Sequence, residues 1–288
     1  MRKLLVPIDF SVTSAAALRY AVQLADAIEY QLEVIHVYDG FSETDPPVIE
    51  GRGSVTAQLS VQRQLDEFVR SHVPGSAGVE GHASQIVGVH AIIGAPPQTI
   101  VRLSKDTAVG LIVMGGVGAS APPARQFTYG SVARAVALRG EAPVLLIPKG
   151  YGVPEIRRMA LAFGELAPLK LIAREVEFLR LALGLSVRFV HVRDDDALRE
   201  SHLNDVLERD RKDTGFPDYP APLDLLRPGE LVDALSEYVA SQQVDLLVLG
   251  RRQRSFFERL FVGSEVSPLL TTIPVPLLIV PIENYANY

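Results

Sequence analysis

The sequence has 288 residues, enough for two domains of ordinary size, with the apolar (48%) and charged (22%) fractions of a globular protein. The net charge of −6 gives no support for general nucleic-acid binding, and no stretch reaches the roughly 18 uninterrupted apolar residues of a membrane helix. The absence of cysteine excludes disulfides and thiolate chemistry, and Asp9 comes too early for a signal peptide. We therefore expect a cytoplasmic protein whose partners are neither nucleic acids nor membranes.

The first half alternates short apolar runs with amphipathic stretches. The runs predict strands at 3–8, 32–37, 86–93, 111–114 and 143–148. Apolar residues at helical spacing predict helices at 55–73 and 98–105, one that begins at Ser11 or Thr13 and ends at Ile28, and one that begins at Gly130. Strands that alternate with helices favour a parallel sheet with right-handed crossovers.

The second half repeats this plan. Its apolar runs predict strands at 158–163, 187–192, 244–249 and 274–281, and its other patterns predict helices at 168–183, 194–211 and 231–239, with a proline-rich loop at 214–222. Gly130-Ser131 and Gly263-Ser264 stand at the same distance before a proline that closes the last strand of each half. This repeated spacing indicates a duplication. We predict two tandem, doubly wound parallel-sheet domains, residues 1–149 and 155–288, joined by a linker at 150–154.

A glycine-rich segment follows the buried strand of the first half. Gly115, Gly116 and Gly118 permit a close approach of the backbone to a ligand, and Gly130-Ser131 begins the next helix. A helix N-terminus offers unpaired N–H groups and a positive dipole end, which suit phosphate. The alternative interpretation is a simple glycine turn.

Motifs for catalysis are missing from the sequence. It contains no Gly-x-Ser-x-Gly elbow, no His-Glu-x-x-His pair and no P-loop lysine, which in phosphoryl transfer counters the charge on the phosphate. His36 and His191 occupy equivalent strand positions, where a hydrogen-bonding role is more common than a metal site. We expect neither an enzyme nor a metal site.

The arrangement resembles the universal stress protein family in its tandem form. The resemblance rests on the opening Leu4-Leu-Val-Pro-Ile-Asp-Phe-Ser11, on Leu111-Ile-Val-Met-Gly115, and on the proline-flanked runs 143–148 and 274–281. It also rests on the nucleotide loop of that family, Gly-x-x-Gly, nine residues, then Gly-Ser or Gly-Thr. Membership implies an adenine-nucleotide α-hydrolase-like, Rossmann-like fold and a non-catalytic stress-response module that binds ATP or a related nucleotide.

The resemblance also implies a site in the first half. Asp9 would contact the base or ribose, the backbone near Val37 would flank the adenine, and the glycine loop with the following helix start would hold the phosphates. These loop and helix residues are Met114, Gly115, Gly118, Gly130, Ser131 and Val132. The sequence leaves open whether Mg²⁺ accompanies the nucleotide.

Both halves depart from the loop pattern. The first half has eleven residues between Gly118 and Gly130, with two prolines among them, whereas the second keeps nine but has Gln253 in place of the second glycine. The counterpart of Asp9 in the second half is Gly164. The first half is therefore the better candidate. Arginines still make the second half a candidate anion site, comprising Gly250, Arg251, Gln253, Arg254, Gly263 and Ser264.

Three functions stay open at this point: a nucleotide-responsive module, a nucleotide-free scaffold with degenerate loops, and a slow ATPase or a binder of another small ligand. The last strand of each half is apolar and flanked by proline, as suits a sheet edge. In the resembled family such strands pair two units. Here they would pair the two domains through 143–148 and 274–281, with pseudo-two-fold symmetry, an unknown protein partner and a possible homodimer.

Overall fold

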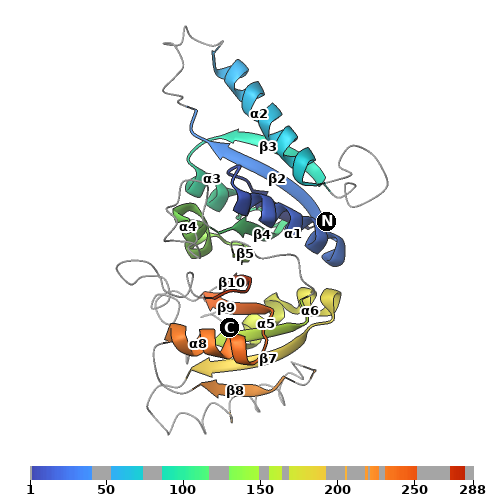
Figure 1. The fold of residues 1–288 in the computed structure, drawn as a ribbon, viewed down its shortest axis with the longest axis vertical. Helices are drawn as coiled ribbons and strands as arrows, with labels where there is room; N and C mark the ends of the chain where they lie inside the picture. The colour runs from blue at the N-terminus through green and yellow to red at the C-terminus, as the bar shows by residue number, and fades with distance from the viewer. Residues whose placement is uncertain are drawn as a thin grey trace. The chain divides into compact units, whose positions relative to one another are not determined.

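The computed structural model divides the chain into two compact units, Met1–Val153 and Pro154–Tyr288. Figure 1 draws unit 1 in blue to green and unit 2 in yellow-green to red. The boundaries that we placed at 149, 150–154 and 155 remain predictions. The structure describes residues 2–40, 53–73, 86–116, 130–148, 156–163, 169–192, 205, 218–219, 221–226, 231–251 and 273–282.

Unit 1 alternates strands and helices along its whole length. Its elements are β1 (Lys3–Pro7), α1 (Val12–Ile28), β2 (Gln31–Tyr38), α2 (Gly53–His72), β3 (Ile86–Ile93), α3 (Pro96–Leu103), β4 (Val109–Gly115), α4 (Ser131–Arg139) and β5 (Val144–Ile147). The strands pair in parallel in the order β3-β2-β1-β4-β5. This is the predicted doubly wound α/β fold.

The core of unit 1 lies where α1 packs on the central strands. β1 and β4 are buried along almost their whole length, as expected of parallel strands covered on both faces. Ala17, Ala21 and Ala25 of α1 are fully buried and lie on one face of the helix. Because these side chains are small, α1 approaches the sheet closely.

Unit 2 repeats the order with fewer described residues. Its elements are β6 (Arg158–Phe163), α5 (Leu169–Glu175), α6 (Glu177–Leu183), β7 (Ser186–Val192), β8 (Leu223–Leu226), α8 (Leu231–Ser241), β9 (Leu246–Arg251) and β10 (Leu277–Pro281). Its strands pair in parallel in the order β8-β7-β6-β9-β10. The duplication extends to the register: Lys3 pairs with Gln31 as Arg158 pairs with Ser186.

Three sequence predictions need correction. The helix expected at 168–183 is two helices, because Val176 has φ −105° and ψ 2°, outside the helical range. Strand β8 was not predicted, since the acid Asp224 interrupts its short apolar run. The helix expected to begin at residue 55 begins two residues earlier, at Gly53. The helix expected at 194–211 lies outside the described residues except for Asp205, which is helical.

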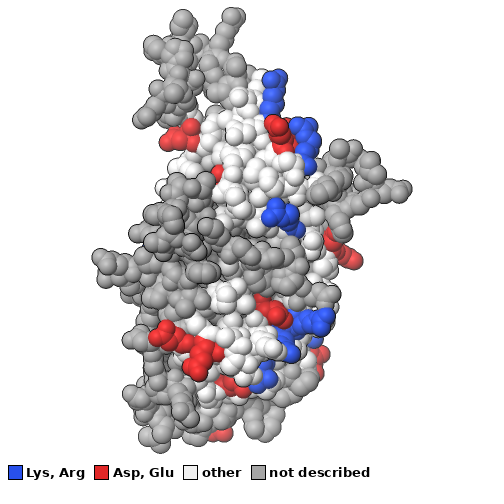
Figure 2. Space-filling view, in the orientation of Figure 1, with Lys and Arg blue, Asp and Glu red and all other residues white. Residues whose placement is uncertain are grey.

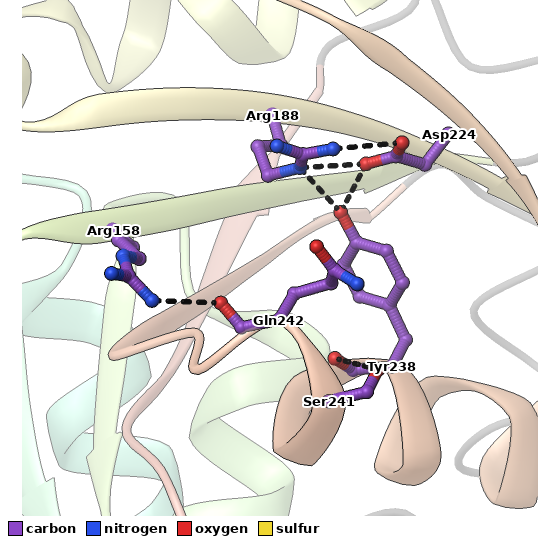
Figure 3. A network of polar contacts seen from close by, with 6 residues as sticks. All are labelled: Arg158, Arg188, Asp224, Tyr238, Ser241 and Gln242. Carbon is purple, nitrogen blue, oxygen red and sulfur yellow. Dashed lines mark hydrogen bonds and ion pairs between the residues drawn. The ribbon is translucent and has the colours of Figure 1, made fainter.

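Two side-chain arrangements fix the outer strands. Gln62 of α2 acts on β3 as the peptide group of a neighbouring strand would: its Nε2 donates to the Val89 carbonyl and its Oε1 accepts from the Ala91 N–H, each at 2.8 Å. In unit 2, Arg188, Asp224 and Tyr238 join β7, β8 and α8 (Figure 3).

None of the described helices is both long and apolar enough to cross a membrane.

Candidate nucleotide site

A cavity lies at the carboxyl ends of β1 and β4. The strand order of unit 1 reverses between β1 and β4, which are neighbours in the sheet. Open α/β sheets bind ligands in the crevice at such a reversal. The cavity has a volume of about 230 Å³. Its lining consists of Pro7, Ile8, Asp9, Thr13, Ser14, His36, Val37, Pro96, Ile100, Met114, Gly115, Gly116, Gly130, Ser131, Val132 and Ala133.

The structure brings together all the described residues that we assigned to the first-half site. Seven line the cavity, and Gly118 lies outside the described residues. The seven are Asp9, Val37, Met114, Gly115, Gly130, Ser131 and Val132. They come from β1, β2, β4 and α4 or from the turns beside these elements, and the sheet brings them together because its strands are parallel.

Asp9 is exposed and forms a closed turn with the start of α1. Its Oδ1 accepts the Ser11 N–H at 3.0 Å and the Ser11 hydroxyl at 2.5 Å. Ser11 Oγ in turn accepts the Ser14 N–H at 3.1 Å and so caps α1. A single carboxylate oxygen therefore organises the helix start, and Asp9 keeps a second oxygen with which a ribose hydroxyl can hydrogen bond.

The start of α4 is different from that of α1. Its N-cap is Gly130, which has no side chain and makes no capping hydrogen bond. The first-turn residues Ser131, Val132 and Ala133 line the cavity, and by helix geometry their N–H groups have no carbonyl partner within the helix. Such groups, together with the positive end of the helix dipole, suit an anion.

Gly115 allows α1 and β4 to meet at the cavity. A Cβ at this position would overlap the carbonyl of Thr13 and crowd the N of Ser14 at 2.9 Å, so only glycine fits against the backbone of α1. At Gly130, by contrast, a Cβ would have nothing within 4 Å. The two glycines have different roles: Gly115 permits packing between elements, and Gly130 leaves space in the cavity.

His36 fixes the strand end that carries Asp9. Its Nδ1 lies 2.7 Å from the Ile8 carbonyl, which can only accept, so Nδ1 carries the proton. His191 repeats the bond to the Phe163 carbonyl at 3.1 Å in unit 2. Both histidines therefore have the hydrogen-bonding role that we predicted, and the bond belongs to the shared fold.

The lining combines the groups that an adenine nucleotide needs. Ile8, Val37, Pro96, Ile100 and Met114 offer an apolar surface for a base, and Thr13, Ser14 and Ser131 offer hydroxyls. Asp9 is the one acid in this lining, and no lysine or arginine is among its described residues. Among the described residues, the groups available to a phosphate are the backbone N–H groups at the start of α4.

Sequence reasoning missed part of this lining. Thr13 and Ser14 are buried polar residues that follow Asp9 by four and five positions, and their place at a helix start beside a strand end was the available signal. Pro96 and Ile100 enter from α3, and only the strand order reveals that α3 reaches the cavity.

In unit 2, isoleucine side chains fill the space beside the glycine that corresponds to Gly115. Gly250, the counterpart of Gly115, has the side chains of Ile172 and Ile282 each 2.5 Å from where a Cβ would lie. Ile172 stands at the position of Ala17 in unit 1 and is fully buried. The carbonyl of Arg251 accepts the Ile282 N–H at 3.0 Å. The remaining predicted residues of the second-half site lie outside the described residues: Gln253, Arg254, Gly263 and Ser264.

Charged residues also lie outside the cavity, and in unit 2 some of them form a structural network. On the face shown in Figure 2, the coloured basic and acidic residues form small groups of both signs. Burial raises the pKa of Asp224, but hydrogen bonds from Arg188 and Tyr238 outweigh this effect and hold the pKa below its usual value. Burial also raises the pKa of Tyr238, which stays neutral and donates to Asp224. Within the described residues, no three His, Asp or Glu side chains group as metal ligands would.

Comparisons with known proteins agree with this description. The sequence model of the universal stress protein family matches residues 1–148 and again residues 156–281. A universal stress protein of Methanocaldococcus jannaschii is 26% identical over 149 residues, which are 51% of this chain and 82% of that protein. The structure of a universal stress protein from Archaeoglobus fulgidus has a TM-score of 0.72 at 16% identity, covering 97% of this chain and 98% of the other.

A second structure is similar along both halves. A putative universal stress protein from Pseudomonas aeruginosa has a TM-score of 0.57 at 12% identity, with 98% of this chain and 93% of the other covered. At such identities the likeness concerns the fold alone, and it confirms the predicted tandem α/β architecture.

Proposed function

Because this chain belongs to the universal stress protein family and carries two of its domains in tandem, we propose that it is a non-catalytic module responsive to adenine nucleotides. The ligand is ATP or a related nucleotide, and its site is the cavity of unit 1. Occupancy then changes protein partners or assembly in the cytoplasm, as part of a stress response.

The observation that carries this proposal is the meeting of Asp9, Gly115 and the open start of α4 in one cavity. Asp9 supplies an acceptor for a ribose hydroxyl, and α4 supplies N–H donors for a phosphate. The apolar lining between them accepts a base. No other described combination in the chain joins these three functions at the switch point of a sheet.

The non-catalytic part of the proposal rests on the chemistry of the lining. Phosphoryl transfer needs positive charge near the transferred group and a residue that orients the attacking nucleophile. The described lining offers neither a lysine nor an arginine. We expect bound ATP to persist rather than to be hydrolysed, so that binding itself is the signal.

A scaffold role is the second candidate, and it has specific support in unit 2. Ile172 and Ile282 fill the space beside Gly250, and the residue in the place of Asp9 is Gly164. Unit 2 would then serve contacts with unit 1 or a partner instead of binding nucleotide.

Nucleotide retained through purification tests the proposal. The native full chain is denatured, and the released small molecules are separated and identified by mass, with Asp9→Ala treated identically. We expect adenine nucleotide from the wild type, or binding on its addition, and much less with Asp9→Ala. Parallel titrations with Mg²⁺ and with a chelator establish whether the metal contributes. Phosphate release from ATP that disappears in Asp9→Ala would contradict the non-catalytic role.

A further inference from the structure

Phe10 has a backbone conformation that is unusual for its residue type. Its φ is 61°, in the left-handed region that is unfavourable for a bulky side chain. The other described non-glycine residues with positive φ are Glu29 and Gln243, and each follows the end of a helix, where this conformation is ordinary. Phe10 instead follows a strand, between Asp9 and the cap residue of α1. Such strain is often found at functional sites.

Two sets of contacts hold Phe10 in this conformation. Asp9 Oδ1 accepts from both the N–H and the hydroxyl of Ser11 and so closes the turn around Phe10. The Phe10 ring lies 4.4 Å from the His36 ring, centroid to centroid, and 5.5 Å from that of Phe68 in a nearly perpendicular arrangement. His36 thus holds both the Ile8 carbonyl and the ring of Phe10.

Unit 2 provides an internal comparison. It keeps the histidine–carbonyl bond, at His191 and Phe163, but has Gly164 and Glu165 where unit 1 has Asp9 and Phe10. There the ring that contacts the histidine is Phe163 itself, at 5.2 Å. The bond therefore belongs to the fold, whereas the Asp-Phe pair accompanies the cavity of unit 1.

We propose that Phe10 is a positioning residue of the nucleotide site: its packed ring maintains the left-handed turn that directs the Asp9 carboxylate toward the ligand. Phe10 is absent from the cavity lining, so it acts through Asp9 and not by contact. The inference rests on the proposed function. Without the ring, the turn samples other conformations. Binding must then order the turn, and the free energy spent on this ordering lowers the affinity for the nucleotide.

Affinities of a series of variants test this role. We expect Phe10→Ala to weaken binding of AMP or ATP by about tenfold, and Phe10→Tyr, which keeps the ring, to restore it. Phe10→Gly should lie between them, because glycine adopts the left-handed conformation without strain even though the ring is lost. A ring that contacted the ligand directly would make Gly and Ala equally harmful. Thermal unfolding of each variant checks that it is folded.

A double-mutant cycle with Asp9→Ala gives the decisive readout. If Phe10 acts through Asp9, then Phe10→Ala causes no further loss of affinity when Asp9→Ala is already present. An equal loss in both backgrounds, or wild-type affinity for Phe10→Ala, would overturn the positioning role alone. A wild-type chain that binds no adenine nucleotide would overturn the proposed function, and this inference with it.

Discussion

At the scale of single residues, glycines of the same sequence motif have unequal structural roles. Gly115 is required by the packing of β4 against α1, because any Cβ would meet the backbone of Thr13, which cannot move independently of the helix. Gly130 is under no such restriction, and its φ of −61° and ψ of 162° are open to any residue. The motif therefore combines a structural glycine with one that leaves room for a ligand.

We predict that Gly115→Ala destabilises unit 1 by about 1–3 kcal/mol through overpacking. Gly130→Ala is the matched control and should cost less than about 1 kcal/mol, the effect of a poorer N-cap residue. Chemical unfolding of the two full-length variants measures the difference. Equal stabilities would show that α1 moves away from β4 without cost and would contradict the described close approach.

The sequence allowed prediction of the chemical type of these residues but not of their geometry. The acid at Asp9 and the glycines after β4 were visible as a pattern. The left-handed Phe10 was not, because its conformation depends on rings contributed by β2 and α2, distant in sequence. Thr13 was visible as a possible helix start and Ser14 was not singled out, and the place of both in the cavity depends on how closely α1 approaches β4.

At the scale of elements, the outer strands are held by polar side chains. Gln62 occupies two backbone groups at the outer edge of β3, the kind of edge that otherwise adds a further strand. This arrangement attaches α2 to the sheet and closes part of the edge at the same time.

Replacing Gln62 with leucine keeps the volume but leaves the Ala91 N–H and the Val89 carbonyl without this partner. We expect a loss of about 1–3 kcal/mol in the local stability of β3. Amide hydrogen exchange at Ala91 should become faster, whereas Gln64→Leu, on the exposed side of α2, should leave it unchanged. Unchanged exchange in Gln62→Leu would mean that this pairing contributes little.

In unit 2 the corresponding outer strand depends on a charged network. Arg188 donates to Asp224 from Nε at 2.7 Å and from Nη2 at 2.9 Å, and Tyr238 adds a third donor (Figure 3). The carboxylate form is thus favoured in the folded state, and the pKa of Asp224 is lowered. Its contribution is complete above the unfolded pKa of about 4 and is lost as pH falls through the folded value.

We therefore predict that Asp224→Ala weakens unit 2 by about 1–2 kcal/mol at neutral pH, after allowance for the partial exposure of Arg188. Exchange of the β8 amides, measured near neutral pH and again well below the lowered pKa of the folded Asp224 carboxyl, reports this effect. The variant should differ from the wild type at neutral pH and converge with it in acid. Tyr238→Phe, which keeps the ion pair, should cost about 1 kcal/mol. A constant difference across this pH range would exclude Asp224 as the titrating group.

Elements were predictable where the apolar pattern was clear. The strands of unit 1 followed from short apolar runs, and the helix that ends at Ile28 followed from apolar spacing over many residues. Strand β8 has only the residues Leu223-Asp-Leu-Leu226, and it is a strand because Arg188 and Tyr238 satisfy Asp224, a tertiary effect. The break between α5 and α6 at Val176 was likewise not predictable, because no glycine or proline stands at that position.

At the scale of the whole molecule, a duplicated domain has kept its fold and diverged in its cavity. Strand β6 pairs with β7 in unit 2 in the same register as β1 pairs with β2 in unit 1. The histidine–carbonyl bond is also present in both units. At the counterparts of Asp9, Phe10 and Ala17, the sequence of unit 2 has Gly164, Glu165 and Ile172. Pairing of the units through 143–148 and 274–281, their pseudo-two-fold relation and a homodimer stay predictions. We infer that one domain carries the ligand and the other has a supporting role.

Calorimetric titration of the full chain with ATP, ADP and AMP tests this division most directly. Gly130→Val and its motif equivalent Gly263→Val serve as a matched pair, since each places the same side chain directly before the serine of a Gly-Ser motif. We predict binding with a stoichiometry near one, lost in Gly130→Val and retained in Gly263→Val. Binding that survives Gly130→Val and is lost in Gly263→Val would place the site in unit 2, and no heat with any of the three nucleotides would contradict nucleotide binding itself.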